Sequence, residues 1–265
     1  MNLERIVSEV KLLARSVGEY LKVEQAKLRK NDVELKGARD YVTYIDKAAE
    51  KMLVNRLQQL LPDSGFLTEE GTVAFEEKEF TWIIDPLDGT SNYIHGDPTY
   101  SVSIALAQDK KTVLGIVYDP VLDQMYWAID GENAFMNSHP LSVSTHAAIE
   151  NAYFGFGIPY RLDEIGEQVL QRAMKQSGRC SFRLKGSAAL DLCYVAAGIT
   201  DAFFHSGLSP WDVAAGAFIL SRAGGKCTDF TGGENYILGQ EIVASNGAIH
   251  EEVMKTIISS PLKRQ

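Results

Sequence analysis

Asp85 and Asp88 are the residues whose type and spacing most clearly allow chemistry. They follow an apolar run at residues 81–84, which predicts a buried strand, and a proline and a glycine beside them predict a tight turn. Ligands collect at such strand ends in α/β folds. The turn can direct both carboxylates and the Leu87 carbonyl at one point, and three hard oxygen donors suit Mg²⁺. The alternative is a turn whose aspartates only accept hydrogen bonds from nearby backbone amides.

Three further acidic positions could complete such a site, although each has an ordinary structural explanation. The pair Glu69 and Glu70 follows an apolar lead-in, and such pairs usually lie on a solvated surface. Asp46 precedes a helical pattern and could be its N-cap. Asp212 opens another predicted helix, where an acidic residue suits the N-cap or the first turn. Taken singly, none of them predicts a metal site.

Two longer motifs give the sequence a family resemblance. Residues 82–93, Trp-Ile-Ile-Asp-Pro-Leu-Asp-Gly-Thr-Ser-Asn-Tyr, closely resemble the first signature of the inositol monophosphatase family, and residues 211–225 resemble the second. Glu69 and Asp46 stand at the expected separations before them. The resemblance covers nearly the whole chain. It implies Mg²⁺-dependent hydrolysis of a small phosphate monoester and a layered αβαβα sandwich of the inositol monophosphatase/fructose-1,6-bisphosphatase type.

The resemblance also implies a centre of two or three Mg²⁺ ions, for which Mn²⁺ could substitute. Glu69, Asp85 and the Leu87 carbonyl would bind the first ion. Asp85, Asp88 and Asp212 would bind the second, with Asp85 bridging, and Glu69 would help with a third through water. Such ions stabilise the negative charge that develops in phosphoryl transfer, and they lower the pKa of an attacking water.

By the same resemblance, the catalytic residues are Asp46, Thr90 and Glu69. The Thr90 hydroxyl can accept a proton from the attacking water only if it passes its own to Asp46, so the pairing makes chemical sense. A segment beginning at Gly186 would bind sugar hydroxyls, but a Gly-Ser helix N-cap explains it equally well. The substrate-binding residues implied are Asp88, Gly89, Thr90, Gly186, Ser187, Ala188, His205 and Asp212.

The substrate is less well defined than the reaction. Residues 91–93 are like the inositol monophosphatase branch, so inositol monophosphate is the leading prediction. However, His205 stands where typical members carry a glutamate that binds an inositol hydroxyl. A histidine could suit another polyol or a second phosphate, or it could be a structural residue at the rim. Fructose 1,6-bisphosphate, NADP or another nucleotide phosphate, histidinol phosphate and a non-catalytic regulatory role are the alternatives.

The composition narrows the partners and the compartment. The 265-residue chain has a net charge of −9 and no conspicuous basic cluster, so nucleic acid is not an expected partner. Cys180, Cys193 and Cys227 are widely spaced and predict a reducing, cytoplasmic environment. The N-terminus reads as an amphipathic helix rather than a signal peptide, and no apolar run is long enough to span a membrane. A homodimer and inhibition by Li⁺ are expected from the resemblance alone.

The hydrophobic pattern predicts a single α/β catalytic domain, 1–265, of two tightly packed subdomains at about 1–145 and 146–265. Periodicity predicts a helix over the first twenty or so residues, a polar loop or flap at 24–40, and a second helix ending near residue 62. Strands follow at 81–84, 100–106, 113–118 and 124–129. The second half alternates helices at 163–177, 187–197, 211–222 and 248–258 with strands at 201–204 and 241–244, and a junction is expected at 137–148.

Overall fold

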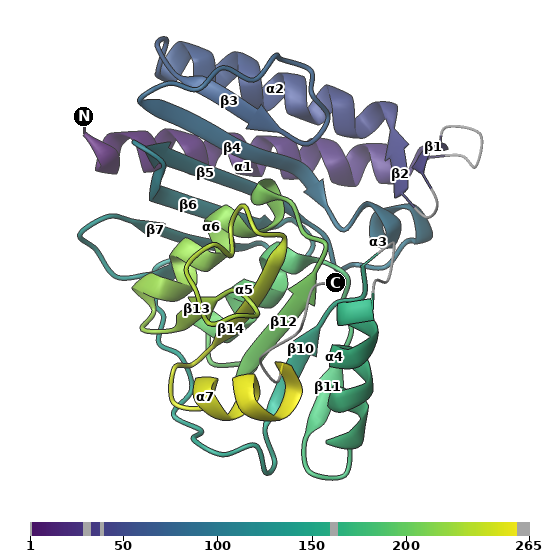
Figure 1. Cartoon of the computed structure of the whole chain (residues 1–265). Coiled ribbons are helices and arrows are strands. Elements are labelled where there is room, and N and C mark those ends of the chain that lie inside the picture. Colours follow the sequence, from purple (N-terminus) through teal and green to yellow (C-terminus); the bar gives the residue numbers. More distant parts are fainter. Residues whose placement is uncertain (1, 29–32, 38–39, 160–163, 259–265) are drawn as a thin grey trace.

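A seven-stranded sheet forms the centre of the N-terminal half of the chain (Figure 1). This computed structural model describes residues 2–28, 33–37, 40–159 and 164–258. Strand β3 pairs parallel with β4, and every following neighbour in the sheet is antiparallel. The strands, in sheet order, are β3 (Gly65–Thr68), β4 (Phe80–Asp88), β5 (Ser101–Gln108), β6 (Lys111–Asp119), β7 (Gln124–Ile129), β8 (Phe135–Met136) and β9 (His139–Pro140).

Two long helices, α1 (Leu3–Gln25) and α2 (Tyr44–Leu60), cover one face of this sheet. Helix α1 starts at Asn2, whose side chain accepts a hydrogen bond from the Arg5 amide at 2.9 Å. Its apolar residues recur every three or four positions, so one stripe of the helix is buried against the sheet. The predicted N-terminal helix is therefore confirmed and extends a little further than expected.

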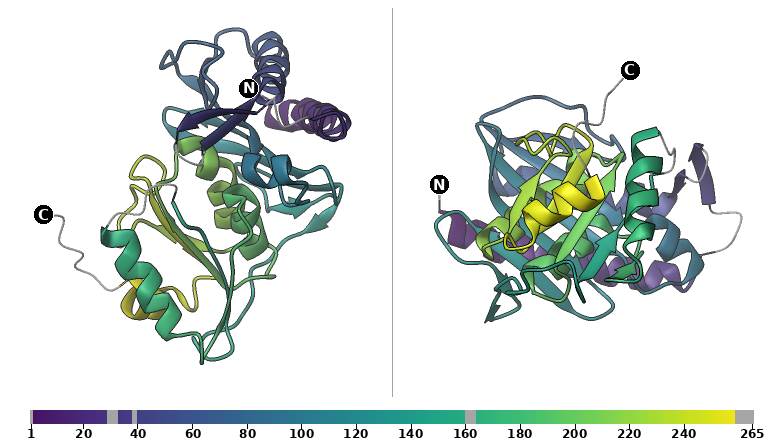
Figure 2. Two further views of the ribbon diagram at one scale, coloured as in Figure 1. Left: turned by 90° about the vertical axis from the view of Figure 1, so that its right-hand side faces the viewer. Right: turned by 60° about the horizontal axis from the view of Figure 1, so that its bottom comes forward.

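The opposite face of the sheet packs on α5 (Ala188–Ala196) and α6 (Pro210–Arg222). Every residue of α5 is buried, because the helix lies between two sheets and has no solvent face. Figure 2 shows α5 and α6 in green between the seven-stranded sheet and a second, smaller one. A helix that is apolar all round is what such a central layer requires.

The second sheet has five strands, and its outer face is covered by α4 (Glu164–Lys175), α7 (His250–Val253) and a π-helical turn at Met254–Ile258. Its strands, in sheet order, are β11 (Ser181–Arg183), β10 (Tyr153–Phe156), β12 (Ala202–Ser206), β14 (Glu241–Ser245) and β13 (Lys226–Thr228). From α1 and α2 to α4 and α7 the layers follow the order αβαβα, as predicted (Figures 1 and 2). The chain passes between sheets after Pro140, around the expected junction, while the two-subdomain description stays a prediction.

The polar segment at 24–40 is where the loop prediction was wrong. Strands β1 (Val33–Gly37) and β2 (Asp40–Thr43) pair antiparallel as a two-stranded sheet. The strands pair through backbone hydrogen bonds, and the segment has no clear apolar alternation, so its polar composition concealed them. The remaining part of the predicted flap, residues 29–32 and 38–39, lies outside the described residues. In the described part of the chain, no helix is long and apolar enough to cross a membrane.

Close packing of α6 on the sheet depends on Gly115 in β6. A Cβ atom there would lie 2.8 Å from the Ala215 carbonyl oxygen in α6. We therefore expect Gly115→Ala to lower the free energy of unfolding by about 2 kcal/mol, because overpacking separates helix from sheet. Urea unfolding measures this. Gly178→Ala is the matched control, since open space surrounds that position, and it should change stability by less than about 0.5 kcal/mol; equal effects would contradict the packing argument.

Candidate active site

A bulge at the end of β4 sets the direction of two carboxylates. Asp85 pairs with Ser103 of β5 and Asp88 pairs with Ser101, so β4 has one extra residue between them. The Leu87 amide donates to Asp85 Oδ1 at 2.8 Å and closes the turn. Both aspartates are almost fully buried. The bulge thus brings two residues that would otherwise point to opposite faces of the sheet toward one space.

The chain after the bulge places a hydroxyl group beside a third carboxylate. Gly89 has a φ of 92°, and a Cβ there would lie 2.9 Å from the Thr99 carbonyl oxygen, so only glycine fits. Thr90 begins α3 (Thr90–His95), and its Oγ1 lies 3.0 Å from the Leu87 carbonyl oxygen and 3.3 Å from Asp46 Oδ1. Asp46 is buried in the first turn of α2, which begins at Tyr44, so the N-cap interpretation of this residue was wrong.

Asp212 reaches the same space from α6. Ser209 is the N-cap of this helix, and its amide donates to Asp212 Oδ2 at 2.7 Å in a capping box. The Ser103 hydroxyl donates to the Trp211 carbonyl oxygen at 3.0 Å, which ties the start of α6 to β5. Asp212 is therefore a capping residue, as its structural explanation predicted, and also a residue of the site.

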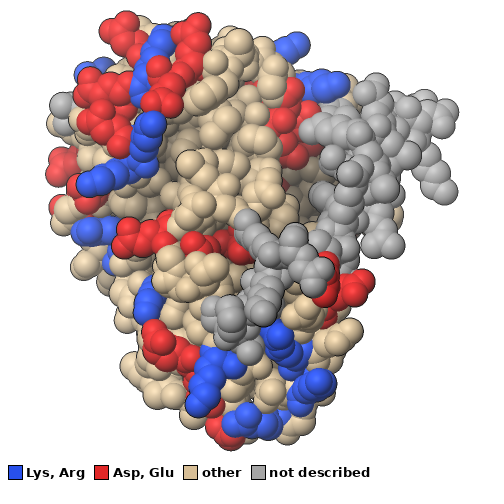
Figure 3. Space-filling model, viewed as in Figure 1, with Lys and Arg blue, Asp and Glu red and all other residues tan. Residues whose placement is uncertain are grey.

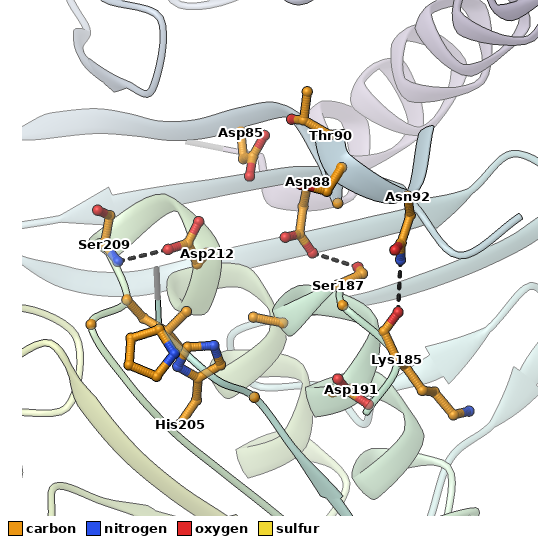
Figure 4. Close-up of a pocket in the computed structure, with 18 of the residues that line it drawn as sticks. Asp85, Asp88, Thr90, Asn92, Lys185, Ser187, Asp191, His205, Ser209 and Asp212 are labelled. Atoms are coloured by element: carbon orange, nitrogen blue, oxygen red, sulfur yellow. Dashed lines mark hydrogen bonds between the residues drawn. The ribbon is translucent and has the colours of Figure 1, made fainter. Parts of the chain in front are cut away.

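One carboxylate oxygen from each of Asp85, Asp88 and Asp212 lies within 4.8 Å of the others. Figure 4 shows the three side chains directed toward one another from β4 and α6. None of the three forms an ion pair with a lysine or arginine of the described residues. Three converging carboxylate oxygens, two of them on buried residues and none with a protein counter-charge among the described residues, are the donor set that a hard divalent cation prefers.

Burial and mutual repulsion raise the pKa values of these groups. Burial, followed by the charges of Glu69, Asp88 and Asp212, raises the pKa of Asp85 well above its usual range. Burial raises the pKa of Asp88 to about 6 against the hydrogen bonds that it accepts, and burial with the Asp88 charge raises that of Asp212 to about 7. Each raised pKa means that the described groups of the protein do not fully stabilise the negative charge of the carboxylate.

Glu69 and its neighbours are held by a buried glutamate that sequence reasoning missed. Glu69 follows β3, and its amide continues the pairing with β4 by donating to the Ile84 carbonyl oxygen at 3.2 Å. Glu50 of α2 accepts hydrogen bonds from the Thr68 hydroxyl at 2.9 Å and from the Glu70 amide at 2.7 Å. The available signal was an acidic residue at helical spacing to Leu53 and Leu57, on the apolar side of the helix.

The segment at 186–188 both caps a helix and lines the pocket. Ser187 is the N-cap of α5 and accepts from the Leu190 amide at 3.4 Å. Its hydroxyl donates to Asp88 Oδ2 at 2.5 Å, and the Ala189 amide donates to the same oxygen at 2.9 Å. Asn92 fixes the preceding residue by donating to the Lys185 carbonyl oxygen at 2.7 Å (Figure 4). The N-cap interpretation is thus confirmed, and the segment also holds Asp88 in place.

These residues surround a pocket of about 560 Å³. Asp46 does not line it but accepts a hydrogen bond from Thr90, which does. Sequence reasoning missed Lys185 and Asp191, which also line the pocket; the available signal was an aspartate within the apolar α5. The predicted residues that line it are Glu69, Asp85, Leu87, Asp88, Gly89, Thr90, Gly186, Ser187, Ala188, His205 and Asp212.

His205, in β12, presents one ring nitrogen as an acceptor. Its Nδ1 lies 2.5 Å from the Ser206 carbonyl oxygen, so that nitrogen carries the hydrogen and Nε2 keeps its lone pair. Burial lowers the pKa of His205 to about 4, and the ring is therefore neutral at pH 7. Gly157 makes room for it, because a Cβ there would overlap the imidazole.

Acidic and basic side chains are interspersed on the face of the molecule in Figure 3. Acidic residues gather at its upper left among lysines and arginines, and the basic residues at its lower end are interrupted by acidic ones. The described part of this face therefore has no uniformly basic surface.

Comparison with known proteins decides the family. The sequence profile of the inositol monophosphatase family matches residues 2–261. The chain belongs to the inositol monophosphatase family. A fructose-1,6-bisphosphatase/inositol-1-monophosphatase of Thermotoga maritima is 38% identical over 256 residues, 96% of each chain. The Nus factor SuhB of Escherichia coli K12 is 39% identical over 234 residues, 86% of this chain and 88% of the relative.

The fold of this family member agrees with solved structures. The extragenic suppressor protein suhB of Bartonella henselae superposes with a TM-score of 0.91 at 34% identity, covering 97% of this chain and all of the other. The predicted fold type is thereby confirmed. The inositol monophosphatase family is a family of phosphatases, and the relatives of this chain include proteins named as enzymes and as a Nus factor.

The raised carboxyl pKa values predict a pH-dependent stability in metal-free protein. A group whose pKa is higher in the folded state binds more protons there, so its contribution to the free energy of unfolding falls as the pH rises from 3.8 toward about 7. Asp212→Asn removes this charge and keeps an oxygen that can accept the Ser209 amide. We expect the variant to gain stability relative to wild type between pH 5 and pH 8, by about 1 kcal/mol or more.

Thermal unfolding in EDTA at several pH values measures this difference. The exposed Asp63→Asn variant is the control and should follow wild type at every pH. A difference between Asp212→Asn and wild type that does not change with pH would contradict the proposed repulsion.

Proposed function

We propose that this protein is a Mg²⁺-dependent phosphomonoesterase, with inositol monophosphate as its main substrate. The observation that carries the proposal is the convergence of Asp85, Asp88 and Asp212 within 4.8 Å, without a basic partner among the described residues. Membership of a phosphatase family supports the reaction class. The name of the Thermotoga maritima relative, which includes inositol-1-monophosphatase, supports the substrate.

The residues of the site fit two or three Mg²⁺ ions. Asp85 would be shared between two ions, with Glu69 and the Leu87 carbonyl on one side and Asp88 and Asp212 on the other. Mg²⁺ keeps several of its own waters, so few protein ligands per ion suffice. When bound, the ions supply positive charge to the phosphoryl oxygens and make a bound water more acidic.

The protein's own groups orient the phosphate and move a proton. The backbone amides of Gly89 and Thr90 would donate to phosphate oxygens, since no side chain at position 89 obstructs the approach. Thr90 Oγ1 would take a proton from the attacking water as it donates its own to Asp46 Oδ1, 3.3 Å away. Ser187 and Ala189 would hold Asp88 by one oxygen and leave the other for metal and substrate.

Phosphate release tests the reaction. With Mg²⁺, wild type should hydrolyse inositol 1-phosphate, and EDTA should abolish turnover. Asp88→Asn should lower kcat/KM at least about 1,000-fold because it weakens the metal centre, and Thr90→Ala about 100-fold or more because the proton relay is lost. Asp63→Asn should match wild type.

The substrate panel for this assay contains fructose 1,6-bisphosphate, NADP and histidinol phosphate beside inositol 1-phosphate. A higher kcat/KM on another member would reassign the substrate and keep the reaction. Absence of turnover on every member would favour the regulatory alternative, which the Nus factor name of one relative supports. From the family resemblance we also propose a homodimer and inhibition by Li⁺.

His205 should bind substrate through Nε2 as a neutral acceptor. His205→Gln can place an amide oxygen near the same position and should keep KM for inositol 1-phosphate within about 3-fold, whereas His205→Leu should raise it about 10-fold or more through the lost hydrogen bond. Because the pKa of His205 is about 4, its protonation should not appear in pH profiles above pH 5.5. Equal KM values for wild type and the leucine variant would show that the ring only fills space.

A further inference from the structure

Asp191 is a buried carboxylate in the pocket that the proposed mechanism does not use. It lies in the first turn of α5, is only 2% exposed and lines the pocket that also contains Asp88 and Asp212. Figure 4 shows it below Ser187, on the side of the pocket where His205 lies and away from Asp85 and Thr90. Asp191 therefore faces the part of the pocket away from the carboxylate cluster.

The Asp191 carboxylate has no hydrogen-bond donor among the described residues. Its Oδ1 is shielded from solvent and unpartnered, so Oδ2 is the oxygen that a donor in the pocket can reach. Burial raises the pKa of Asp191 well above its usual range, and the charge of Lys185 only partly opposes this shift. The Lys185 ammonium lies over the Tyr194 ring, 3.6 Å from its centroid, and forms no ion pair in the described part of the chain. A buried carboxylate without donors is strongly unfavourable, so a group that donates to it is missing from the protein alone.

Two other buried carboxylates in this fold have their donors. Asp201 accepts from the Ser144 hydroxyl at 2.5 Å and from the Tyr153 amide at 2.8 Å. Asp119 accepts from the amides of Val121 and Leu122, each at 2.9 Å. These residues fix loops and strand ends, and their side chains are satisfied. Asp191 has no such structural role, because its carboxylate accepts no hydrogen bond from a backbone amide of the described residues.

The surroundings of Asp191 leave room for its carboxylate and suit hydroxyl groups. Gly155 on β10 has no side chain, and a Cβ there would lie 3.1 Å from Asp191 Oδ1. The carboxylate oxygens accept hydrogen bonds and repel phosphate, and nearby His205 Nε2 is also an acceptor. Asp191 is not part of the three-carboxylate cluster that could hold a cation.

We propose that Asp191 is a specificity-determining residue that accepts hydrogen bonds from hydroxyl groups on the alcohol half of the substrate. The assignment rests on the proposed phosphatase function and deepens it. Asp191 favours a substrate whose alcohol is neutral and polyhydroxylated, such as a cyclitol or sugar, over one whose alcohol carries a second phosphate near this position. The hydroxyl groups supply the donors that the buried carboxylate lacks.

Two substrates with the same ring test the proposal: inositol 1-phosphate, and cyclohexyl phosphate, which lacks the ring hydroxyls. Asp191→Asn should raise KM for inositol 1-phosphate about 10-fold or more, because an amide oxygen is a weaker acceptor than a carboxylate that the substrate hydroxyls stabilise. Its kcat/KM for cyclohexyl phosphate should stay within about 2-fold of wild type. The nearly isosteric Asp191→Leu should show the same pattern with a larger KM increase.

Asp201→Asn is the matched control, since that carboxylate is buried and satisfied within the protein. It should lower Tm and affect both substrates alike, whereas Asp191→Asn should not lower Tm. Equal losses on both substrates, no loss on either, or a large fall in Tm for both Asp191 variants would overturn the proposal. Wild type that hydrolyses neither ester in Mg²⁺ would instead refute the phosphatase function itself, so the two failures are distinguishable.

Discussion

The repulsion among Asp85, Asp88 and Asp212 is the constraint on which the rest of this structure depends. Three carboxylates, two of them buried and that of Asp212 partly buried, approach one another without a lysine or arginine partner in the described part of the chain. Such an arrangement is costly to the apo protein, since both desolvation and like charge oppose ionisation. Bound cations would neutralise the repulsion among the carboxylates. Metal binding would therefore raise the free energy of unfolding that the repulsion lowers.

The fold meets this constraint by holding each carboxylate from a different direction. The bulge in β4 directs Asp85 and Asp88, while the capping box of α6 directs Asp212. Helix α6 lies against the sheet closely because Gly115 has no side chain to obstruct Ala215. Rigid elements on both sides keep the three groups from moving apart, and positions held in this way are what a metal-dependent reaction needs.

The sequence was most informative about elements and site residues that lie within the two family signatures. The β4 strand, its turn and the start of α6 lie within the two signatures, so the family resemblance was enough to group Asp85, Asp88 and Asp212. The β1–β2 hairpin was not predicted, because its pairing depends on backbone hydrogen bonds rather than on apolar periodicity. Asp191 was missed for another reason: its missing donors are visible only when every neighbour is placed in space.

Metal occupancy is the most direct test of this account. Crystals grown with Mn²⁺ in place of Mg²⁺ would give anomalous difference peaks at each bound ion. The account predicts at least two peaks that share Asp85, one with Glu69 and the Leu87 carbonyl and the other with Asp88 and Asp212, each with oxygen ligands at about 2.0–2.3 Å. An anomalous map at saturating Mn²⁺ with no peak in contact with Asp85 would contradict it.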